Sequence, residues 1–320
     1  MKKVFVVLLL LMSVSYGYTQ EKIVDSIDQR GDQYLNITNF KNAFKANIGS
    51  STGNDIYIVV NDCYDNSEFC GNHGDGMVGV INSIKVSNNV KTIERSNIET
   101  AIKCTTEGKN GRVKCVLDNS VEQLLKKGNI RVWNESNGFP LLPNARQSIS
   151  NAIAQDKFKR LIKKYDTMYI VSSGNNKEKQ VSSRNSKTII NNPLDNLLTV
   201  AQFGIDLNSG KPVMQNGMFF RAPDFSVFGE YLIEDEKGLM SVGGTSNAAA
   251  VTSAIIAQYY SIMPCWSTMD MKRFINATLK PAKDIDLEDK WTKTKKYLSY
   301  SEKIFDKNFL RNHNINVCKN

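Results

Sequence analysis

The sequence predicts an α/β fold in which helices flank a central, largely parallel β-sheet. Short apolar runs of strand length alternate along the chain with longer helix-like stretches, which is the order expected for a parallel sheet. The 320 residues are 41% hydrophobic and 23% charged, a composition typical of globular domains. A domain of this size buries enough apolar surface to fold around its own core.

Strands are predicted where four or five mostly apolar residues, many of them β-branched or aromatic, follow one another. These runs cover residues 56–60, 130–133, 168–171 and 197–200. Helix-like segments cover residues 76–83, 120–127, 148–164 and 246–262.

Small polar residues follow three of the predicted strands. Asn61 and Asp62 come directly after the first strand, residues 134–138 after the second and residues 172–175 after the third. Functional residues of parallel sheets gather beyond the carboxyl ends of the strands. By itself this pattern indicates an α/β enzyme or an α/β binding protein.

The first seventeen residues have the organisation of an export signal. Lys2 and Lys3 precede an apolar run at residues 4–12, and small residues follow at 15–17. The run is shorter than the roughly 20 residues that cross a bilayer, which makes an uncleaved anchor the less favoured alternative. We expect a secreted or periplasmic protein with no membrane attachment after signal cleavage.

Six cysteines fit an exported chain, because an even number in such a chain favours disulfides. The alternative is that some remain free thiols. Local spacing favours Cys63 with Cys70, and Cys104 with Cys115 across a hairpin near residues 109–112, which leaves Cys265 with Cys318 as the third pair.

The formal net charge of +9 is spread along the chain rather than gathered in one segment. Spread basic charge usually marks a solvated surface, and no nucleic-acid motif accompanies it. No cluster of cysteine and histidine has the spacing of a zinc site. We therefore expect no nucleic-acid partner and no cofactor; a structural calcium ion is left open, because no calcium-binding loop can be assigned.

His73 is the histidine best placed for chemistry. It opens the glycine-rich segment at residues 73–80, whereas His313, the other histidine of the chain, lies in a polar tail. Histidine is the commonest general base. The alternative is a structural role, which is the more frequent one for a lone histidine.

Ser246 stands among small residues where a long apolar helix is predicted to begin. The backbone N–H groups at a helix N-terminus favour developing negative charge, which suits a nucleophile whose attack creates an oxyanion. The alternative is that Ser246 only caps the helix. Asn175, after the third strand, offers an amide donor that could stabilise the same charge, although asparagine in a turn usually serves the local backbone.

Taken together, these segments resemble the subtilisin-like serine proteases (subtilases, peptidase family S8) in type and in order along the chain. Gly244 to Ala249 is similar to the family's Gly-Thr-Ser-Met-Ala-(Ala/Ser) motif, and His73 to Gly79 to its His-Gly-Thr-x-Val-Ala-Gly motif. The other similar segments are Ser173 to Asn175, Val132 to Gly138, Leu197 to Ala201 and Ala222-Pro223. The resemblance covers roughly residues 55–280.

The resemblance implies a three-layer subtilisin-like fold and a secreted serine endopeptidase that works through an Asp-His-Ser triad and an acyl-enzyme. It implies Ser246 as nucleophile, His73 as general base and Asp62 as the aspartate, with Asn175 helping to form the oxyanion hole. The partner is then a protein or peptide substrate. Implied substrate-binding residues are Asn134, Ser136, Asn137, Gly138 and Ser173.

The aspartate position departs from the family pattern, in which the strand ends in Asp-(Ser/Thr)-Gly. Here the strand is followed by Asn61, Asp62, Cys63, Tyr64 and Asp65. Asp62 is favoured, but a one-residue slip would place Asn61 there, and Asp65 is a third candidate.

We expect a signal peptide at residues 1–17, an N-terminal extension at 18–54, the peptidase domain at 55–285 and a tail at 286–320 tied by Cys265 and Cys318. Two alternatives keep the fold. One is a catalytically impaired protein used for binding, and the other is the catalytic subunit of a secreted toxin with a partner subunit. An unrelated α/β hydrolase is disfavoured, because Ser246 lacks the Gly-x-Ser-x-Gly context.

Overall fold

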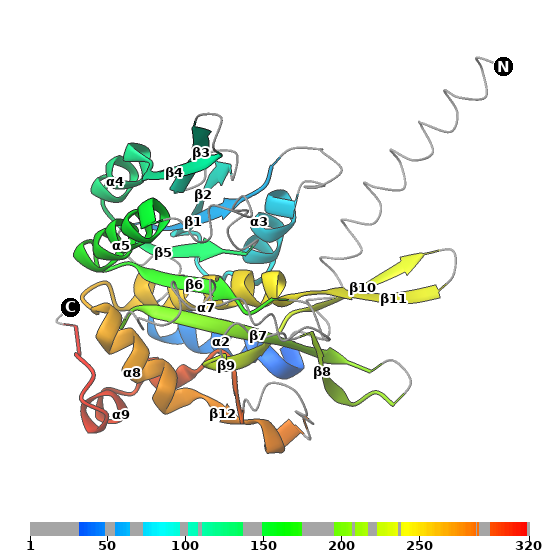
Figure 1. The fold of residues 1–320 in the computed structure, drawn as a ribbon. Coiled ribbons are helices and arrows are strands. Elements are labelled where there is room, and N and C mark those ends of the chain that lie inside the picture. The colour runs from blue at the N-terminus through cyan, green and yellow to red at the C-terminus, as the bar shows by residue number, and fades with distance from the viewer. Residues whose placement is uncertain are drawn as a thin grey trace, which may run out of the picture.

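The central sheet of the computed structural model confirms the predicted α/β class (Figure 1). The structure describes residues 32–48, 55–64, 73–96, 102–107, 111–136, 149–174, 195–206, 209–216, 223–235, 238–285, 287 and 295–318. Within these ranges the strands of the main sheet run in the order β12-β13-β9-β7-β6-β5-β1-β2, and β8 pairs with β7.

The four predicted strands form the middle of this sheet and are parallel to one another. They are β1 (Ile56–Asp62), β5 (Ile130–Glu135), β6 (Met168–Ser172) and β7 (Leu197–Ile205). Most of their residues are buried, as expected for strands covered on both faces, although Val171 and Ser172 at the end of β6 are partly exposed.

Further strands extend the sheet on both sides. Parallel neighbours are β2 (Val90–Ser96) beside β1, β9 (Phe225–Phe228) beside β7, and β13 (Lys296–Leu298) beside β9. The antiparallel neighbours are β8 (Pro212–Asn216) and β12 (Lys280–Pro281).

Helices cover both faces, because alternate residues of the strands point to opposite sides. Val59 of β1 belongs to the core beneath α4 (Asn119–Lys126) and α5 (Ile149–Lys164). Ile58 and Val60 belong to the larger core on the other face. That core includes residues of α2 (Ile37–Asn47), α3 (His73–Ile84), α7 (Thr245–Ile262) and α8 (Thr268–Thr278).

The helix α7 lies in the interior of the molecule. Every residue from Thr245 to Ser261 is buried, and its contacts reach α3 and several central strands. A helix that is apolar all round is stable only when it is enclosed in this way. The position of the first turn of α7 is therefore set by the surrounding core.

Two hairpins stand beside the main sheet. One pairs β3 (Ile102–Glu107) with β4 (Arg112–Leu117) and carries the Cys104–Cys115 disulfide. The other pairs β10 (Glu230–Asp235) with β11 (Gly238–Gly243); it extends outward in Figure 1 and leads directly into α7.

Both ends of the described chain contribute to the core. Phe40 of α2 stacks on Tyr300 with ring centroids 4.6 Å apart, and Tyr34 stacks on Phe228. Beyond residue 285 the chain adds β13 to the sheet, a short 3₁₀ helix (Glu302–Phe305) and α9 (Lys307–Asn312). The packed core thus extends past residues 55–285 on both sides.

The Cys265–Cys318 disulfide joins the end of the described chain to the segment before α8. Of the three expected pairings, this one and Cys104–Cys115 are present. Cys70 lies outside the described residues, as does the expected signal peptide. None of the described helices is both long enough and apolar enough to span a bilayer.

Candidate active site

The candidate site lies where the central parallel strands end and the helices α3 and α7 begin. Asp62 is the last residue of β1 and Ser136 directly follows β5. His73 opens α3, and Ser246 is the second residue of α7. The sheet topology therefore brings together residues that are far apart in the sequence.

Asp62 and His73 form a contact at this edge. Oδ1 of Asp62 lies 2.8 Å from Nδ1 of His73 and also accepts the Cys63 N–H at 2.7 Å. Asp62 is fully buried, whereas the His73 side chain is 31% exposed. A carboxylate facing Nδ1 favours the tautomer with the proton on Nδ1, which leaves Nε2 as the basic nitrogen.

The start of α3 is held by its neighbours. The Gly74 N–H donates to the Cys63 carbonyl at 2.7 Å. A Cβ on Gly74 would lie 2.6 Å from the Tyr64 ring, so only glycine fits there. The Tyr64 hydroxyl donates in turn to the Val60 carbonyl at 3.0 Å. The orientation of His73 thus depends on close packing between the end of β1 and the first turn of α3.

The three candidates for the aspartate position are separated by geometry. Asn61 points to the opposite face of the sheet from Asp62, where its Nδ2 donates to Glu135 at 2.8 and 3.0 Å. Asp65 lies outside the described residues. Among the described residues, Asp62 is the carboxylate in contact with His73.

Ser246 is buried at the N-terminus of α7, where it has a partner other than histidine. Its Oγ donates to the carbonyl oxygen of Ser136 at 2.9 Å, and the same oxygen accepts from the Ser172 hydroxyl at 2.7 Å. The described contacts include no hydrogen bond between Ser246 and His73. The structure therefore brings Asp62 to His73 and Ser246 to Ser136.

The amide of Asn134 is used inside the protein. Asn134 is fully buried; its Nδ2 donates to the Ser253 hydroxyl at 3.0 Å, and its Oδ1 accepts from the Ser136 hydroxyl at 2.6 Å. These bonds attach β5 to α7 and orient Ser136. The described side-chain hydrogen bonds of Asn134 are with Ser253 and Ser136, and the substrate contact implied by the sequence stays a prediction.

The other implied binding residues lie at or beyond the edge of the described chain. Ser173 is buried, and its N–H donates to the Val200 carbonyl at 3.0 Å. Asn137, Gly138 and Asn175 lie outside the described residues. Gly174, which precedes Asn175, donates its N–H to the Thr245 hydroxyl at 3.0 Å. The segment that leads into Asn175 is thus joined to the residue before Ser246.

The sequence analysis did not single out Glu135, whose side chain is 1% exposed and lies on the face of the sheet opposite to that of Asp62. Burial raises the pKa of Glu135 to about 8, against hydrogen bonds from Asn61 and Trp133 that favour the charged form. One signal was available: Glu135 is a charged residue at the end of a strand that is otherwise buried.

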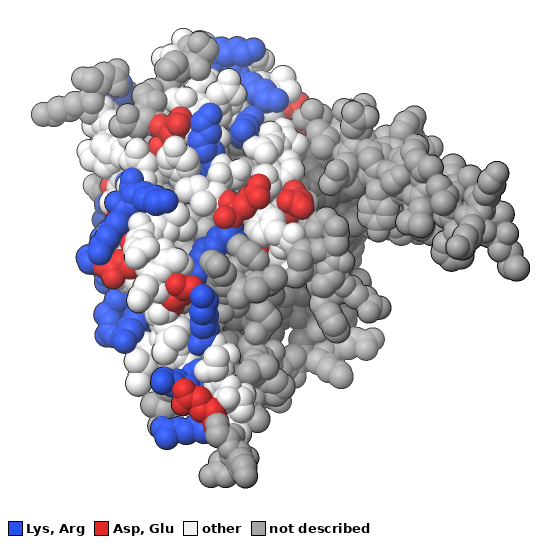
Figure 2. Space-filling view, turned by 90° about the horizontal axis from the view of Figure 1, so that it is seen from above, with Lys and Arg blue, Asp and Glu red and all other residues white. Residues whose placement is uncertain are grey.

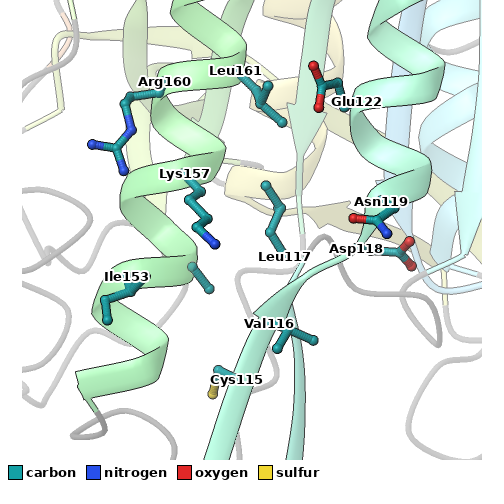
Figure 3. A pocket seen from close by; sticks show the side chains of 11 residues that line it. Cys115, Val116, Leu117, Asp118, Asn119, Glu122, Ile153, Lys157, Arg160 and Leu161 are labelled. Atoms are coloured by element: carbon teal, nitrogen blue, oxygen red, sulfur yellow. The ribbon is translucent and has the colours of Figure 1, made fainter.

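Surface features away from this edge are less distinctive. Within the described residues, no group of three or more His, Cys, Asp or Glu is arranged to hold a metal ion. In Figure 2, basic and acidic side chains are interspersed over the described part of the face shown. A groove of about 530 Å³ between β4, α4 and α5 includes Leu117, Ile153 and Lys157 (Figure 3) and shares no residue with the site above.

Comparisons with known proteins agree with this architecture. The A subunit of the AB5 toxin from E. coli superposes with a TM-score of 0.53 at 15% identity, over 86% of this chain and 98% of that chain. A structure of the subtilase cytotoxin SubAB assembly gives 0.51 at 15% identity, over 86% and 94%. The prenylagaramide maturation protease PagA gives 0.50 at 15% identity, over 83% and 98%.

At such low identity these likenesses establish a shared fold alone. No curated protein matches the chain in sequence. The model of the subtilase family, Peptidase_S8, matches residues 24–303. Because this match spans most of the sequence, the chain belongs to the subtilase family.

Proposed function

We propose that this subtilase is an exported serine endopeptidase with Ser246 as nucleophile, His73 as general base and Asp62 as the residue that orients the base. The observation that carries the proposal is the 2.8 Å contact between buried Asp62 and partly exposed His73, at the edge of the sheet where Ser246 begins α7. A base held by a buried carboxylate beside a serine at a helix N-terminus is the arrangement that nucleophilic catalysis requires.

In the proposed reaction, Nε2 of His73 takes the proton of Ser246 as Oγ bonds to the carbonyl carbon of the substrate. Asp62 stabilises the imidazolium that results. The backbone N–H of Ser246 and the amide of Asn175 would hold the oxyanion. Collapse of the tetrahedral intermediate breaks the peptide C–N bond, and His73 gives its proton to the leaving amine. A water molecule, activated by His73, then hydrolyses the acyl-enzyme.

The hydrogen bond from Ser246 to Ser136 represents the resting arrangement in this proposal. Rotation about the Cα–Cβ bond of Ser246 would release the Ser136 carbonyl and turn the hydroxyl toward His73. Catalytic hydrogen bonds are often loose without substrate and tighten only in the complex. The Ser172 hydroxyl, which also donates to the Ser136 carbonyl, keeps that oxygen partnered when Ser246 leaves it.

Export is part of the proposal. It is supported by the signal-like sequence of residues 1–17 and by the two disulfides, which persist in oxidising compartments and are rare in the cytosol. Amino-terminal sequencing of the protein recovered outside the cell would test it: mature chains should begin near residue 18. Retention of the intact chain in the cytoplasm would contradict it.

The decisive experiment is labelling of the mature protein with a fluorophosphonate probe, which reacts with activated serines. We expect labelling of the wild type, none of Ser246→Ala and strongly reduced labelling of Asp62→Ala. Ser261→Ala is the matched control, because Ser261 lies near the other end of the same helix and donates to the Gln258 carbonyl. A folded wild type that takes no label would favour the alternative of a catalytically impaired binding protein.

A second candidate function is the catalytic subunit of a secreted toxin. It is supported by the Cys265–Cys318 disulfide, which joins the end of the described chain to the segment before α8. A segment held in this way would offer an ordered surface to a partner subunit. Purification from the native source, followed by measurement of the mass of the assembly, distinguishes an independent endopeptidase from a toxin subunit. An active monomer would contradict the toxin candidate, and a stable complex with a small secreted protein would support it.

A further inference from the structure

A buried pair joins the strands that carry the candidate site, on the face of the sheet opposite to it. Asn61 of β1 is the register partner of Glu135 of β5. Nδ2 of Asn61 lies 3.0 Å from Oε1 and 2.8 Å from Oε2 of Glu135. Asn61 is fully buried and Glu135 is 1% exposed.

Each member of this pair directly precedes a residue of the site. Asn61 precedes Asp62, which contacts His73, and Glu135 precedes Ser136, whose carbonyl accepts from the Ser246 hydroxyl. Asp62 and Ser136 thus depend on the same pair of strand ends. A bond between those ends limits how far the two residues can move apart.

The orientation of the Asn61 amide is set by its other neighbour. Nη1 of Arg95 donates to Oδ1 of Asn61 at 2.8 Å, and arginine can only donate. The Nδ2 group must therefore face Glu135. Nε1 of Trp133 also donates to Oε2 of Glu135 at 3.3 Å. The described side-chain hydrogen bonds of Glu135 thus all come from donors. This environment suits an ionised carboxylate and leaves a carboxylic O–H poorly accommodated.

Charged and titratable groups lie around Glu135 on the neighbouring strands. The Asp62 carboxylate on β1 opposes its ionisation and Arg95 on β2 favours it. Arg95 itself lies 3.6 Å from Asp118, which is bridged at 2.8 Å by Lys103 of β3. The phenol of Tyr169 on β6 stays neutral, because burial and the nearby Glu135 raise its pKa.

We infer that Asn61 and Glu135 form a positioning clamp that holds the ends of β1 and β5 at the separation required by Asp62 and Ser136, and that the clamp is complete only when Glu135 is ionised. The inference deepens the proposed function and rests on it. Ionised Glu135 has the further effect of adding negative charge behind Asp62, which stabilises the imidazolium form of His73 as the proton is transferred.

If the clamp requires ionised Glu135, the activity of Ser246 should depend on the ionisation of two groups, His73 and Glu135. Burial raises the pKa of Glu135 to about 8, so the clamp would tighten above neutral pH. The rate of Ser246 labelling by a fluorophosphonate should then rise in two steps, the first with deprotonation of His73 and the second with deprotonation of Glu135. The probe avoids any need to know the natural substrate.

The test compares second-order labelling rates from pH 6 to 9.5 for the wild type, Glu135→Gln, Glu135→Asp and Ser267→Ala. Glutamine imitates the neutral acid, so Glu135→Gln should lack the second step and label about tenfold more slowly than the wild type at pH 9, with little difference at pH 6.5. Glu135→Asp keeps a carboxylate and should retain a second step.

Ser267→Ala is the control for general loss of stability. It removes the capping box of α8, which shares no residue with the clamp or the candidate site, and it should leave the shape of the profile unchanged. Thermal melting at each pH shows which variants are folded.

The outcomes separate the two proposals. A wild type that is not labelled at any pH overturns the proposed function and the clamp with it. A labelled wild type with a single ionisation, or a folded Glu135→Gln that keeps the second step, overturns the clamp alone. If Glu135→Gln does not fold, the wild-type profile and Glu135→Asp still decide the question.

Discussion

Asn61 and Asp62 are neighbours on β1, yet their side chains lie on opposite faces of the sheet. The carboxylate of Asp62 contacts His73, whereas the amide of Asn61 contacts Glu135. A strand alternates its side chains strictly, so a one-residue change of register would exchange the two environments. This relationship decides which residue can serve the histidine.

Asp62→Asn should reduce the rate of fluorophosphonate labelling by at least about 10³-fold, because the His73 imidazole loses the acceptor that fixes its tautomer. The double variant Asn61→Asp/Asp62→Asn is the matched control. It restores a carboxylate one residue away on the wrong face, and it should not recover activity. Recovery in the double variant would show that the strand register in solution differs from the one described.

Gly74→Ala should destabilise the protein by about 1–3 kcal/mol and lower the labelling rate, because the new methyl group would overlap the Tyr64 ring. Gly76→Ala, on the same helix, is the control. Its Cβ would meet nothing within 4 Å, and alanine is the better helix former by about 0.5–1 kcal/mol. Urea unfolding of the two variants should therefore shift in opposite directions. Equal shifts would contradict the packing at the start of α3.

Glu135 should make the folded protein less stable as the pH rises. Burial raises the pKa of this carboxyl from 4.5 to about 8, so the folded state binds the proton more tightly than the unfolded chain does. The stabilising contribution is fully present below pH 4.5 and is lost as the pH rises through 8. Each pKa unit corresponds to about 1.4 kcal/mol.

Glu135→Gln removes this titration, so the difference in unfolding free energy should move in favour of the variant between pH 5 and pH 9. Urea titrations at both pH values measure it. A constant difference would indicate that Glu135 is ionised throughout that range in the folded state.

The two described disulfides should differ in their effect on stability. Cys265–Cys318 closes a separation of 53 residues and Cys104–Cys115 one of 11. Because the entropy removed from the unfolded chain grows with loop length, replacing the first pair by serine should cost about 1 kcal/mol more than replacing the second. Thermal melting of the two double-serine variants tests this order. A larger loss at the β3–β4 hairpin would mean that local strain or packing outweighs chain entropy.

The middle of the fold could be predicted because its signals are local. The strands β1, β5, β6 and β7 are apolar runs, and α7 begins at small residues and continues as an apolar helix. The edge strand β13 has three residues and no pattern of its own; it is a strand because β9 offers an unpaired edge. Tertiary context, which a single sequence does not display, decides such elements.

The site divides in the same way. His73 and Ser246 stand in segments whose residue types already indicate chemistry. The end of the predicted strand limited the candidates for the residue that orients the histidine to Asp62 and its near neighbours. The role of Asn134 and the existence of the Asn61–Glu135 pair depend on which strands lie side by side. Asn134 faces α7 because β5 crosses beneath that helix, and Glu135 meets Asn61 because β5 pairs with β1.

The packing of α2 against the C-terminal segment has a consequence for biosynthesis. Phe40 and Tyr300 stack on each other, and Asn36 donates to the Tyr300 carbonyl across 264 residues, so the first described helix gains partners from a segment far along the chain. A nascent chain on the ribosome has no partner for the apolar face of α2 until the segment around Tyr300 has been made. The core that includes both segments can therefore close only late in synthesis, and α2 depends on contacts that form after the central strands are already in place.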